Sequence, residues 1–194
     1  MNFSFKYAGN FCIAERPSPL SSLPGQCFVI DEKYYAIAKR SPGIVKFVTK
    51  KGSHLDCFNK DIYSFVGPVG AGFSNCDAKR AVVIAGGTGI GAAINLLESR
   101  SQDLETHLIF YSREESPLVD ICKELGANPP TNSIVQWNTA LNGRPKAPLD
   151  PFVKREHSYY DLHVFVVGPK SLVDSTREQC KLLGIPEANF HLNY

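Results

Sequence analysis

The sequence predicts two structural units in tandem: a small antiparallel β-barrel over residues 1–77, then a doubly wound α/β unit with a parallel sheet over residues 78–194. In the first half, short runs rich in Val, Ile, Phe and Tyr alternate with turn residues and show no helical periodicity, as in small barrels and sandwiches. In the second half, continuous apolar runs alternate with helical patterns, which is typical of strands buried on both faces of a sheet. A glycine-rich sequence, residues 86–91, follows the first of these buried runs.

The first half contains four predicted strands. Their β-branched and aromatic residues favour extended structure, and Gly, Pro, Asn and Asp punctuate the segments between them. The four runs are CFVI (27–30), YYAIA (34–38), IVKFVT (44–49) and IYSFVG (62–67). The segment RPSPLSSLPG (16–25) has the composition of a loop that leads into the first of them.

The second half contains four further predicted strands, with helices between them. The strands are AVVIA (81–85), LIFYS (108–112), IVQW (134–137) and VFVVG (164–168). We expect one helix directly after the glycine-rich sequence and another over about residues 171–183.

A third helix is predicted from apolar residues at positions 118, 121, 122 and 125, which follow the helical spacing. Ser116 is the expected N-cap of this helix and Pro117 its first residue. Gly126 stands where a glycine commonly ends a helix.

Composition excludes several classes of protein. The 21 basic and 19 acidic residues give no charge excess that would suggest a nucleic-acid partner. The longest apolar runs are far short of the roughly 20 residues of a spanning helix, and the N-terminus lacks the pattern of a signal peptide, so we expect a cytoplasmic protein without a membrane span. The six cysteines form no metal-binding spacing, and we expect them to be mostly free thiols.

The glycine-rich sequence is the most informative candidate site. Glycines between a buried strand and a helix let the chain turn sharply, and they let a diphosphate approach the free N–H groups of the helix N-terminus. A purely structural tight turn requires the same glycines. A second turn, Val167-Gly168-Pro169, also follows a buried strand, and the carboxyl ends of parallel strands meet at the same edge of a sheet, where ligands bind. The sequence therefore predicts that both turns face one crevice.

The motifs, in their order along the chain, resemble those of the ferredoxin–NADP reductase family. PGQCFVI (24–30) is similar to the family's PGQ-plus-strand element, and KYYAIA (33–38) stands where its flavin-binding Arg-x-Tyr-Ser element belongs. VKFVTKKGSHL (45–55) resembles the strand and glycine-led turn beside the flavin diphosphate. The remaining matches are GPVGAGF (67–73), IAGGTGIG (84–91), Tyr111-Ser112-Arg113, Val167-Gly168-Pro169 and GIPEANFHLNY (184–194).

This resemblance implies a barrel that holds FAD, or less often FMN, and an α/β unit that holds NAD(P)H. It implies hydride transfer from NAD(P)H to the flavin and onward passage of electrons to an acceptor. The cofactors would carry the chemistry, so neither a catalytic side chain nor a metal site is expected, and the five histidines are expected at the surface or at strand ends. The implied cofactor-binding residues are Lys33, Tyr35, Ala36, Ile37, Gly52, Ser53, Gly86, Gly87, Thr88, Gly89, Ile90, Ser112, Arg113, Gly168 and Pro169.

The chain also departs from the family pattern. Lys33 replaces an arginine, Ala36 replaces a hydroxyl residue near the reactive nitrogen of the flavin, and Val167 replaces a cysteine. Three functions therefore stay open: an NAD(P)H oxidoreductase that acts alone, an electron-transfer subunit with a partner, and a non-enzymatic nucleotide-binding module that has lost the flavin. The choice between NAD and NADP is also open, because Arg113 suits a 2′-phosphate whereas the adjacent Glu114 and Glu115 suit a free ribose.

Overall fold

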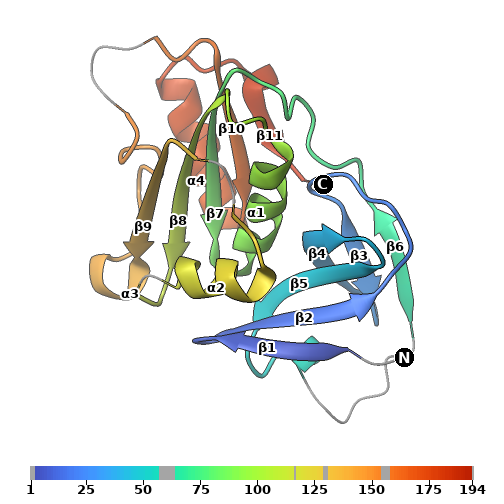
Figure 1. Ribbon diagram of the computed structural model, residues 1–194. Coiled ribbons are helices and arrows are strands. Elements are labelled where there is room, and N and C mark those ends of the chain that lie inside the picture. Colours follow the sequence, from blue (N-terminus) through green and yellow to red (C-terminus); the bar gives the residue numbers. More distant parts are fainter. Residues whose placement is uncertain (1–2, 57–63, 116, 129–130, 154–157, 194) are drawn as a thin grey trace.

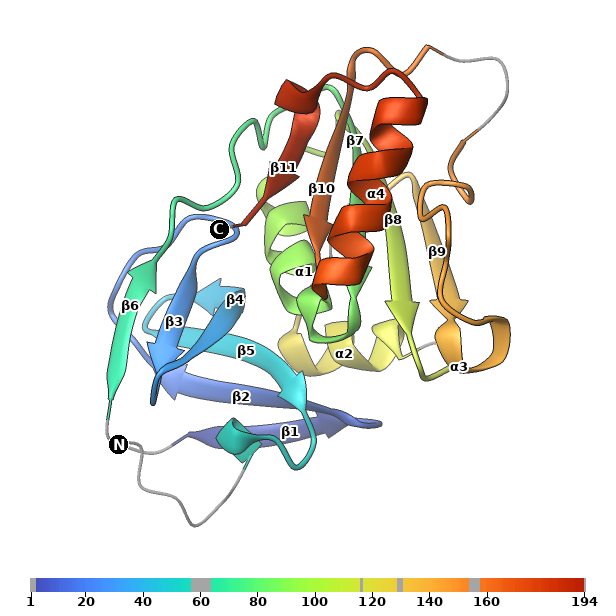
Figure 2. The same ribbon diagram turned by 180° about the vertical axis from the view of Figure 1, so that it is seen from behind.

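The computed structural model describes residues 3–56, 64–115, 117–128, 131–153 and 158–193. It contains two sheets that lie side by side, one built from the N-terminal part of the chain and one from the C-terminal part (Figure 1). The segment between the last strand of the first sheet and the first strand of the second runs along the outside of the molecule (Figure 2).

The N-terminal sheet has six antiparallel strands in the order β1-β2-β5-β4-β3-β6. In the described residues its edge strands, β1 and β6, do not pair with each other, so the sheet is barrel-like but not closed. This confirms the predicted antiparallel class and the four predicted strands as β3 to β6, although residues 62–63 lie outside the described part. The strands are β1 Ser4–Ala8, β2 Phe11–Pro17, β3 Cys27–Ile30, β4 Lys33–Ser41, β5 Ile44–Lys50 and β6 Phe65–Val69, and the short 3-10 helix η1, His54–Asp56, follows β5.

Strands β1 and β2 were missed by the sequence patterns, although a local signal for them exists. Ala8 pairs with Phe11, so the two strands form a hairpin closed by Gly9 and Asn10. Gly9 has a φ of +60°, a conformation that glycine adopts without strain. A two-residue loop of this composition is a known hairpin signal, and it places four consecutive buried residues of β2 against β5.

The C-terminal sheet has five parallel strands in the order β11-β10-β7-β8-β9. The chain moves outward from β7 through β8 to β9, then returns to the other side of β7 to form β10. This reversal between β7 and β10 is the topological switch point at which open α/β sheets bind ligands. The strands are β7 Arg80–Gly86, β8 Glu105–Ser112, β9 Ser133–Asn138, β10 Leu162–Val167 and β11 Phe190–Leu192; the helices are η2 Gly87–Gly89, α1 Ile90–Ser99, α2 Leu118–Leu125, α3 Thr139–Asn142, α4 Lys170–Leu182 and η3 Glu187–Asn189.

Helices cover both faces of the parallel sheet, which confirms the doubly wound prediction (Figure 2). Val83 and Phe110 belong to the core that α1 and α2 cover, whereas Val82 and Ile84 belong to the core that α4 covers. Successive residues of β7 therefore point to opposite cores, which explains its uninterrupted apolar sequence.

The two sheets meet where α1 packs against β4 and β5. A Cβ at Gly91 of α1 would lie 3.0 Å from Ala38 Cβ and 3.1 Å from Val48 Cβ, so glycine allows the helix to approach the sheet closely. Asn95 Nδ2 of the same helix donates to the Ile37 carbonyl at 3.0 Å.

Two lysines of the N-terminal sheet bind α2. Lys46 Nζ donates to the Leu125 carbonyl at 3.0 Å, and Lys39 Nζ contacts the Gly126 carbonyl and lies 3.0 Å from Glu98 Oε1. Positive charge at a helix C-terminus is stabilising, because it satisfies the last carbonyls and complements the helix dipole.

Several local predictions can be compared with the structure. Helix α2 begins at Leu118, so Pro117 precedes the helix rather than beginning it, and Ser116 lies outside the described residues. Gly126 ends α2 with a φ of +67°, as predicted. The five described cysteines are free, and Cys57 lies outside the described part. The expectation for the histidines was wrong for His191, which is buried within β11.

Candidate functional site

The two predicted glycine turns lie against each other at the switch point. Each follows one of the adjacent strands β7 and β10, which pair up to Ala85 and Val167. A Cβ at Gly86 would lie 2.9 Å from Pro169 Cδ, and a Cβ at Gly168 would lie 3.2 Å from Gly86 Cα. Glycine at positions 86 and 168 is therefore required by the packing of the two turns against each other.

The glycines of the first turn differ in what surrounds them. A Cβ at Gly89 would lie 3.1 Å from Val167 Cγ1 and closer still to the Val167 carbonyl group, so Gly89 is also required by packing. Gly87 has a φ of +56°, and a Cβ there would meet nothing within 4 Å. Gly87 is thus the glycine of this turn that borders open space, and it is the part of the loop that a ligand could approach.

The N-terminus of α1 lies directly after this open position. Neither η2 nor α1 has a side-chain cap at its N-terminus, and the first turn of α1 carries no acidic residue. The Ile90 N–H is bonded within the turn, to the Gly87 and Thr88 carbonyls. The positive end of the α1 dipole therefore faces the loop without a neutralising side chain, an arrangement suited to an anionic ligand.

At the end of the next strand, β8, the chain places one exposed cation. Ser112 is buried, and its hydroxyl donates to the Glu114 carbonyl at 2.7 Å, so this side chain holds the loop. Glu114 accepts hydrogen bonds from the Asn10 N–H at 3.2 Å and thereby joins the loop to the β1–β2 hairpin. Arg113 is exposed at the carboxyl end of the sheet. Glu115 is exposed as well, so of the three charged groups weighed for the nucleotide ribose, Glu114 is the one that the described part of the chain engages in a structural contact.

On β4, alternate residues lie on opposite faces of the N-terminal sheet. Ile37 is fully buried in the core of this sheet, and the Tyr35 ring packs beside that core, 6.3 Å from the Phe47 ring in a T-shaped contact. Ala36 packs instead against the core shared with α1, and Lys33 is exposed at the beginning of the strand. The four β4 residues implied by the resemblance therefore do not share one surface.

The predicted turn at Gly52 and Ser53 binds an anion of its own chain. The Gly52 N–H donates to Asp56 Oδ2 at 2.5 Å, and the Tyr7 hydroxyl donates to Asp56 Oδ1 at 2.6 Å. Burial of Asp56 opposes its ionisation, but these hydrogen bonds outweigh that effect and hold the pKa of its carboxyl below the usual value. The Ser53 hydroxyl lies 2.5 Å from the Thr49 hydroxyl. The Gly52 amide is thus already satisfied by a carboxylate.

A pair of histidines, of which His191 is buried and His163 half-buried, lies beside the segment that joins the two sheets. His163 Nδ1 of β10 lies 2.9 Å from His191 Nε2 of β11, and His191 Nδ1 lies 3.1 Å from the Ser74 hydroxyl in the joining segment. The His191 ring also stacks on Phe165 with 4.7 Å between ring centroids. Burial and the neighbouring His163 lower the pKa of His191 to about 4. Sequence patterns did not reveal this pair, because its members lie 28 positions apart.

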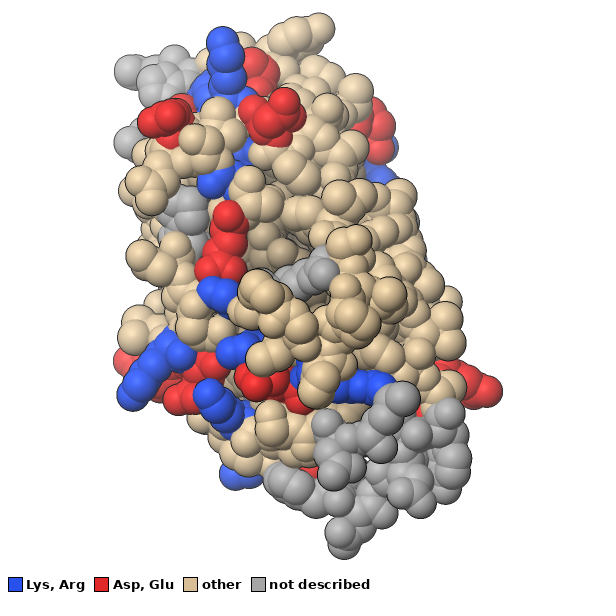
Figure 3. Space-filling model, turned by 45° about the vertical axis from the view of Figure 1, so that its right-hand side comes forward, with Lys and Arg blue, Asp and Glu red and all other residues tan. Residues whose placement is uncertain are grey.

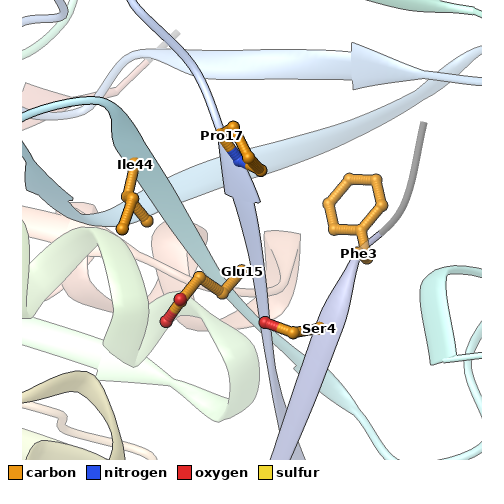
Figure 4. Close-up of a pocket in the computed structure, with 5 residues that line it drawn as sticks. All are labelled: Phe3, Ser4, Glu15, Pro17 and Ile44. Atoms are coloured by element: carbon orange, nitrogen blue, oxygen red, sulfur yellow. The ribbon is translucent and has the colours of Figure 1, made fainter.

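A pocket on the N-terminal sheet lies apart from the predicted site residues. Figure 4 shows its lining side chains, which come from β1, β2, the start of β5 and the residue before β1. None of them is a residue that the sequence predicted to bind a cofactor. They are Phe3, Ser4, Glu15, Pro17 and Ile44.

The predicted residues thus form neighbouring groups rather than a single cluster. Residues 86–90 adjoin Gly168 and Pro169. The 3-10 helix η2 of the first turn contacts β5, and α1 contacts β4.

Within the described residues, no group of His, Cys, Asp and Glu side chains could hold a metal ion. None of the described helices is long and apolar enough to cross a bilayer.

Solved structures with the same fold have been identified. A ferredoxin reductase of carbazole 1,9a-dioxygenase, in its FAD apo form, superimposes with a TM-score of 0.74 at 20% identity over 97% of this chain and 64% of that one. The Amycolatopsis cytochrome P450 reductase gives 0.70 at 18% identity over 100% of this chain and 67% of that one. The FAD/NAD-binding domain of the Vibrio cholerae nitric oxide dioxygenase gives 0.65 at 14% identity over 98% and 96%.

These comparisons define the class of fold. The chain has the two-unit fold of ferredoxin reductase-like FAD- and NAD-binding proteins, as its motifs implied. It spans less than two thirds of the length of the carbazole dioxygenase reductase. No family model and no curated protein matches the sequence.

Proposed function

We propose that this chain is a flavin-dependent NAD(P)H oxidoreductase of the ferredoxin reductase type. The α/β unit would bind NAD(P)H and the N-terminal sheet would bind FAD, or FMN. Hydride passes from the nicotinamide to the flavin in such proteins, and electrons then leave to an acceptor. The observation that carries the proposal is the contact of two glycine turns at the switch point of a sheet, on a loop that lies against β5.

For NAD(P)H, the residues at the switch point fit the ligand. Gly87 leaves room for close approach, and the N-terminus of α1 offers its positive end to a pyrophosphate. Thr88 lies between these two features and would contact the nicotinamide end. Arg113 would contact a 2′-phosphate, which favours NADPH over NADH.

For the flavin, residues of β4 fit the ligand, whereas the turn after β5 fits it less well. Lys33 is exposed and could pair with a flavin phosphate, and Ala36 leaves room on the face of β4 that is directed toward α1. The Gly52 amide is satisfied by Asp56, so a phosphate could bind this amide only by displacing that carboxylate. This last observation favours the second candidate function, a nucleotide-binding module that lacks flavin.

The acceptor is proposed by analogy of fold. A neighbouring structure is the reductase of a dioxygenase system, which makes a protein acceptor or partner subunit the first candidate for this chain as well. We further propose residues 1–77 and 78–194 as the flavin-binding and nucleotide-binding units. A location in the cytoplasm stays a prediction from the sequence.

The absorption spectrum of the purified protein tests the proposal. Bands of oxidised flavin, or their appearance as added FAD or FMN is bound, and their bleaching by NADH or NADPH without oxygen would support the oxidoreductase. A colourless protein that binds NAD(P)H but takes up neither FAD nor FMN would reject it and favour the nucleotide-binding module.

A further inference from the structure

The tip of the β1–β2 hairpin binds the loop that follows β8. Both carboxylate oxygens of Glu114 lie 3.2 Å from the Asn10 amide nitrogen, which donates to them across 104 positions of sequence. A Cβ at Gly9 would collide with Glu114 Oε2 and would lie 3.3 Å from Glu114 Cδ. Glycine at position 9 therefore leaves the space that the carboxylate occupies, and the Asn10 amide holds the carboxylate there.

The hairpin tip is itself held in place. The Asn10 carbonyl accepts a hydrogen bond at 2.8 Å from the Lys51 N–H, just after the end of β5. Phe11 is buried in the core that α1 and α2 cover, and its ring lies 6.3 Å from the Phe110 ring of β8. The hairpin strands also contact α2. The amide that binds Glu114 therefore has a fixed position relative to the end of β8.

The loop that carries Glu114 lies beside the glycine turn. Tyr111 of β8 pairs with Gly86, so the residues after β8 stand next to this turn at the carboxyl end of the sheet. In dinucleotide-binding sheets, a carboxylate at such a strand end accepts hydrogen bonds from a free ribose, whereas an arginine there pairs with a 2′-phosphate. The loop carries both groups, but Arg113 is exposed and Glu114 is half-buried against the hairpin.

The overall charge of the chain does not decide between the two nucleotides. The sequence carries 21 basic and 19 acidic residues. On the face shown in Figure 3, the basic and acidic side chains of the described residues lie intermixed rather than gathered by sign. A preference for an additional phosphate would therefore come from groups close to the ribose, because the field of a mixed surface attracts neither sign strongly.

We infer that Gly9 and Asn10 determine the preference for NADPH over NADH, because they hold the Glu114 carboxylate away from the nucleotide ribose. The inference rests on the proposed binding of NAD(P)H. Gly9 and Asn10 are positioning residues, since they act through Glu114 and do not themselves touch the nucleotide. A carboxylate released from the hairpin would repel a 2′-phosphate and would accept hydrogen bonds from a free ribose, so the preference would move toward NADH.

The test compares the Kd values of NADPH and NADH, measured by calorimetry at low salt, for wild-type protein and Gly9→Ala. The added methyl group displaces the Glu114 carboxylate, so the ratio of NADPH to NADH affinity should fall about fivefold, the size of the repulsion between two exposed charges about 4 Å apart. Added salt should reduce this change, because exposed charges are screened. Gly43→Ala is the matched control, because Gly43 also has a positive φ of +76° in a hairpin, but a Cβ there meets nothing within 4 Å.

Further variants separate the charge of Glu114 from a change in the hairpin. Glu114→Gln makes the released side chain neutral, so adding Gly9→Ala to Glu114→Gln should leave the affinity ratio unchanged. Glu115 is also exposed in this loop and is present in every variant, so the comparison reports Glu114. Gly9→Asn also adds a Cβ, and asparagine adopts a positive φ more readily than alanine, so this variant repeats the test if Gly9→Ala does not fold.

The outcomes separate this inference from the proposed function. If wild-type protein binds neither NADPH nor NADH, both are overturned. If it binds them, three results overturn the inference alone: an unchanged affinity ratio in Gly9→Ala, an equal loss of affinity for both nucleotides, or a fivefold shift that persists in the Glu114→Gln background. Failure of both Gly9 variants to fold would assign Gly9 to the stability of the hairpin and would also overturn the inference.

Discussion

Acid should destabilise this protein through the histidine pair between β10 and β11. His191 is 5% exposed, and burial followed by the charge of His163 lowers the pKa of its imidazole from 6.5 to about 4. The unfolded chain therefore binds a proton at His191 at a higher pH than the folded chain does. Stability from this group is complete above pH 6.5 and is lost as the pH falls from 6.5 toward 4. The shift corresponds to about 3 kcal/mol in the free energy of unfolding between pH 7 and pH 4.

The groups around the pair determine how protonation acts. His163 faces Arg100, which further disfavours a positive charge, whereas Asp161 and Asp77 partly oppose that effect. Two protonated imidazoles would face each other across 2.9 Å and lose their mutual hydrogen bond. The bond from His191 to Ser74 of the joining segment depends on the same ring.

The assay is urea denaturation at pH 7, 6, 5 and 4, with wild-type protein and His191→Gln. Glutamine is neutral at every pH used, so the variant should lose up to about 3 kcal/mol of the pH dependence that wild-type protein shows. Carboxylates such as Asp56 titrate in both proteins, and the difference between the two profiles reports the His163–His191 pair. Equal profiles for the two proteins, or an imidazole of His191 that titrates near 6.5 in NMR spectra, would refute the reasoning.

Three further predictions concern the site and the contact between the sheets. Gly87→Val should weaken NAD(P)H binding more than tenfold, because a branched side chain strains its positive φ and fills the open space; unchanged affinity in folded protein would exclude a pyrophosphate there. Arg113→Ala should weaken NADPH binding by about 1–3 kcal/mol and leave NADH unaffected; equal losses in calorimetry would speak against a 2′-phosphate contact. Lys46→Met should lower the free energy of unfolding by about 1 kcal/mol, since Leu125 loses its donor, and an unchanged urea midpoint would contradict this.

The fold class and the position of the glycine turns follow from the sequence alone, because both depend on local patterns. An uninterrupted run such as residues 81–85 predicts a strand covered on both faces, and parallel connection brings the carboxyl ends of β7 and β10 to one edge. Gly126 ends α2 as predicted, since the left-handed conformation is a property of single residues. The hairpin at Gly9 and Asn10 also has a local signal in its two-residue loop, although the predicted strands do not include it.

Only the tertiary structure shows which groups of the candidate site already have partners within the chain, because these contacts join residues far apart in sequence. Glu114 reaches Asn10 across 104 positions and is engaged in that contact, whereas its neighbours Arg113 and Glu115 are exposed. Asp56 reaches Tyr7 across 49 positions and closes the Gly52 turn. The motif places two tyrosines on β4, but only the structure shows that the Tyr35 ring packs beside Phe47 whereas Tyr34 is exposed. A local pattern records which residues share a face of a strand, and the structure determines what that face contacts.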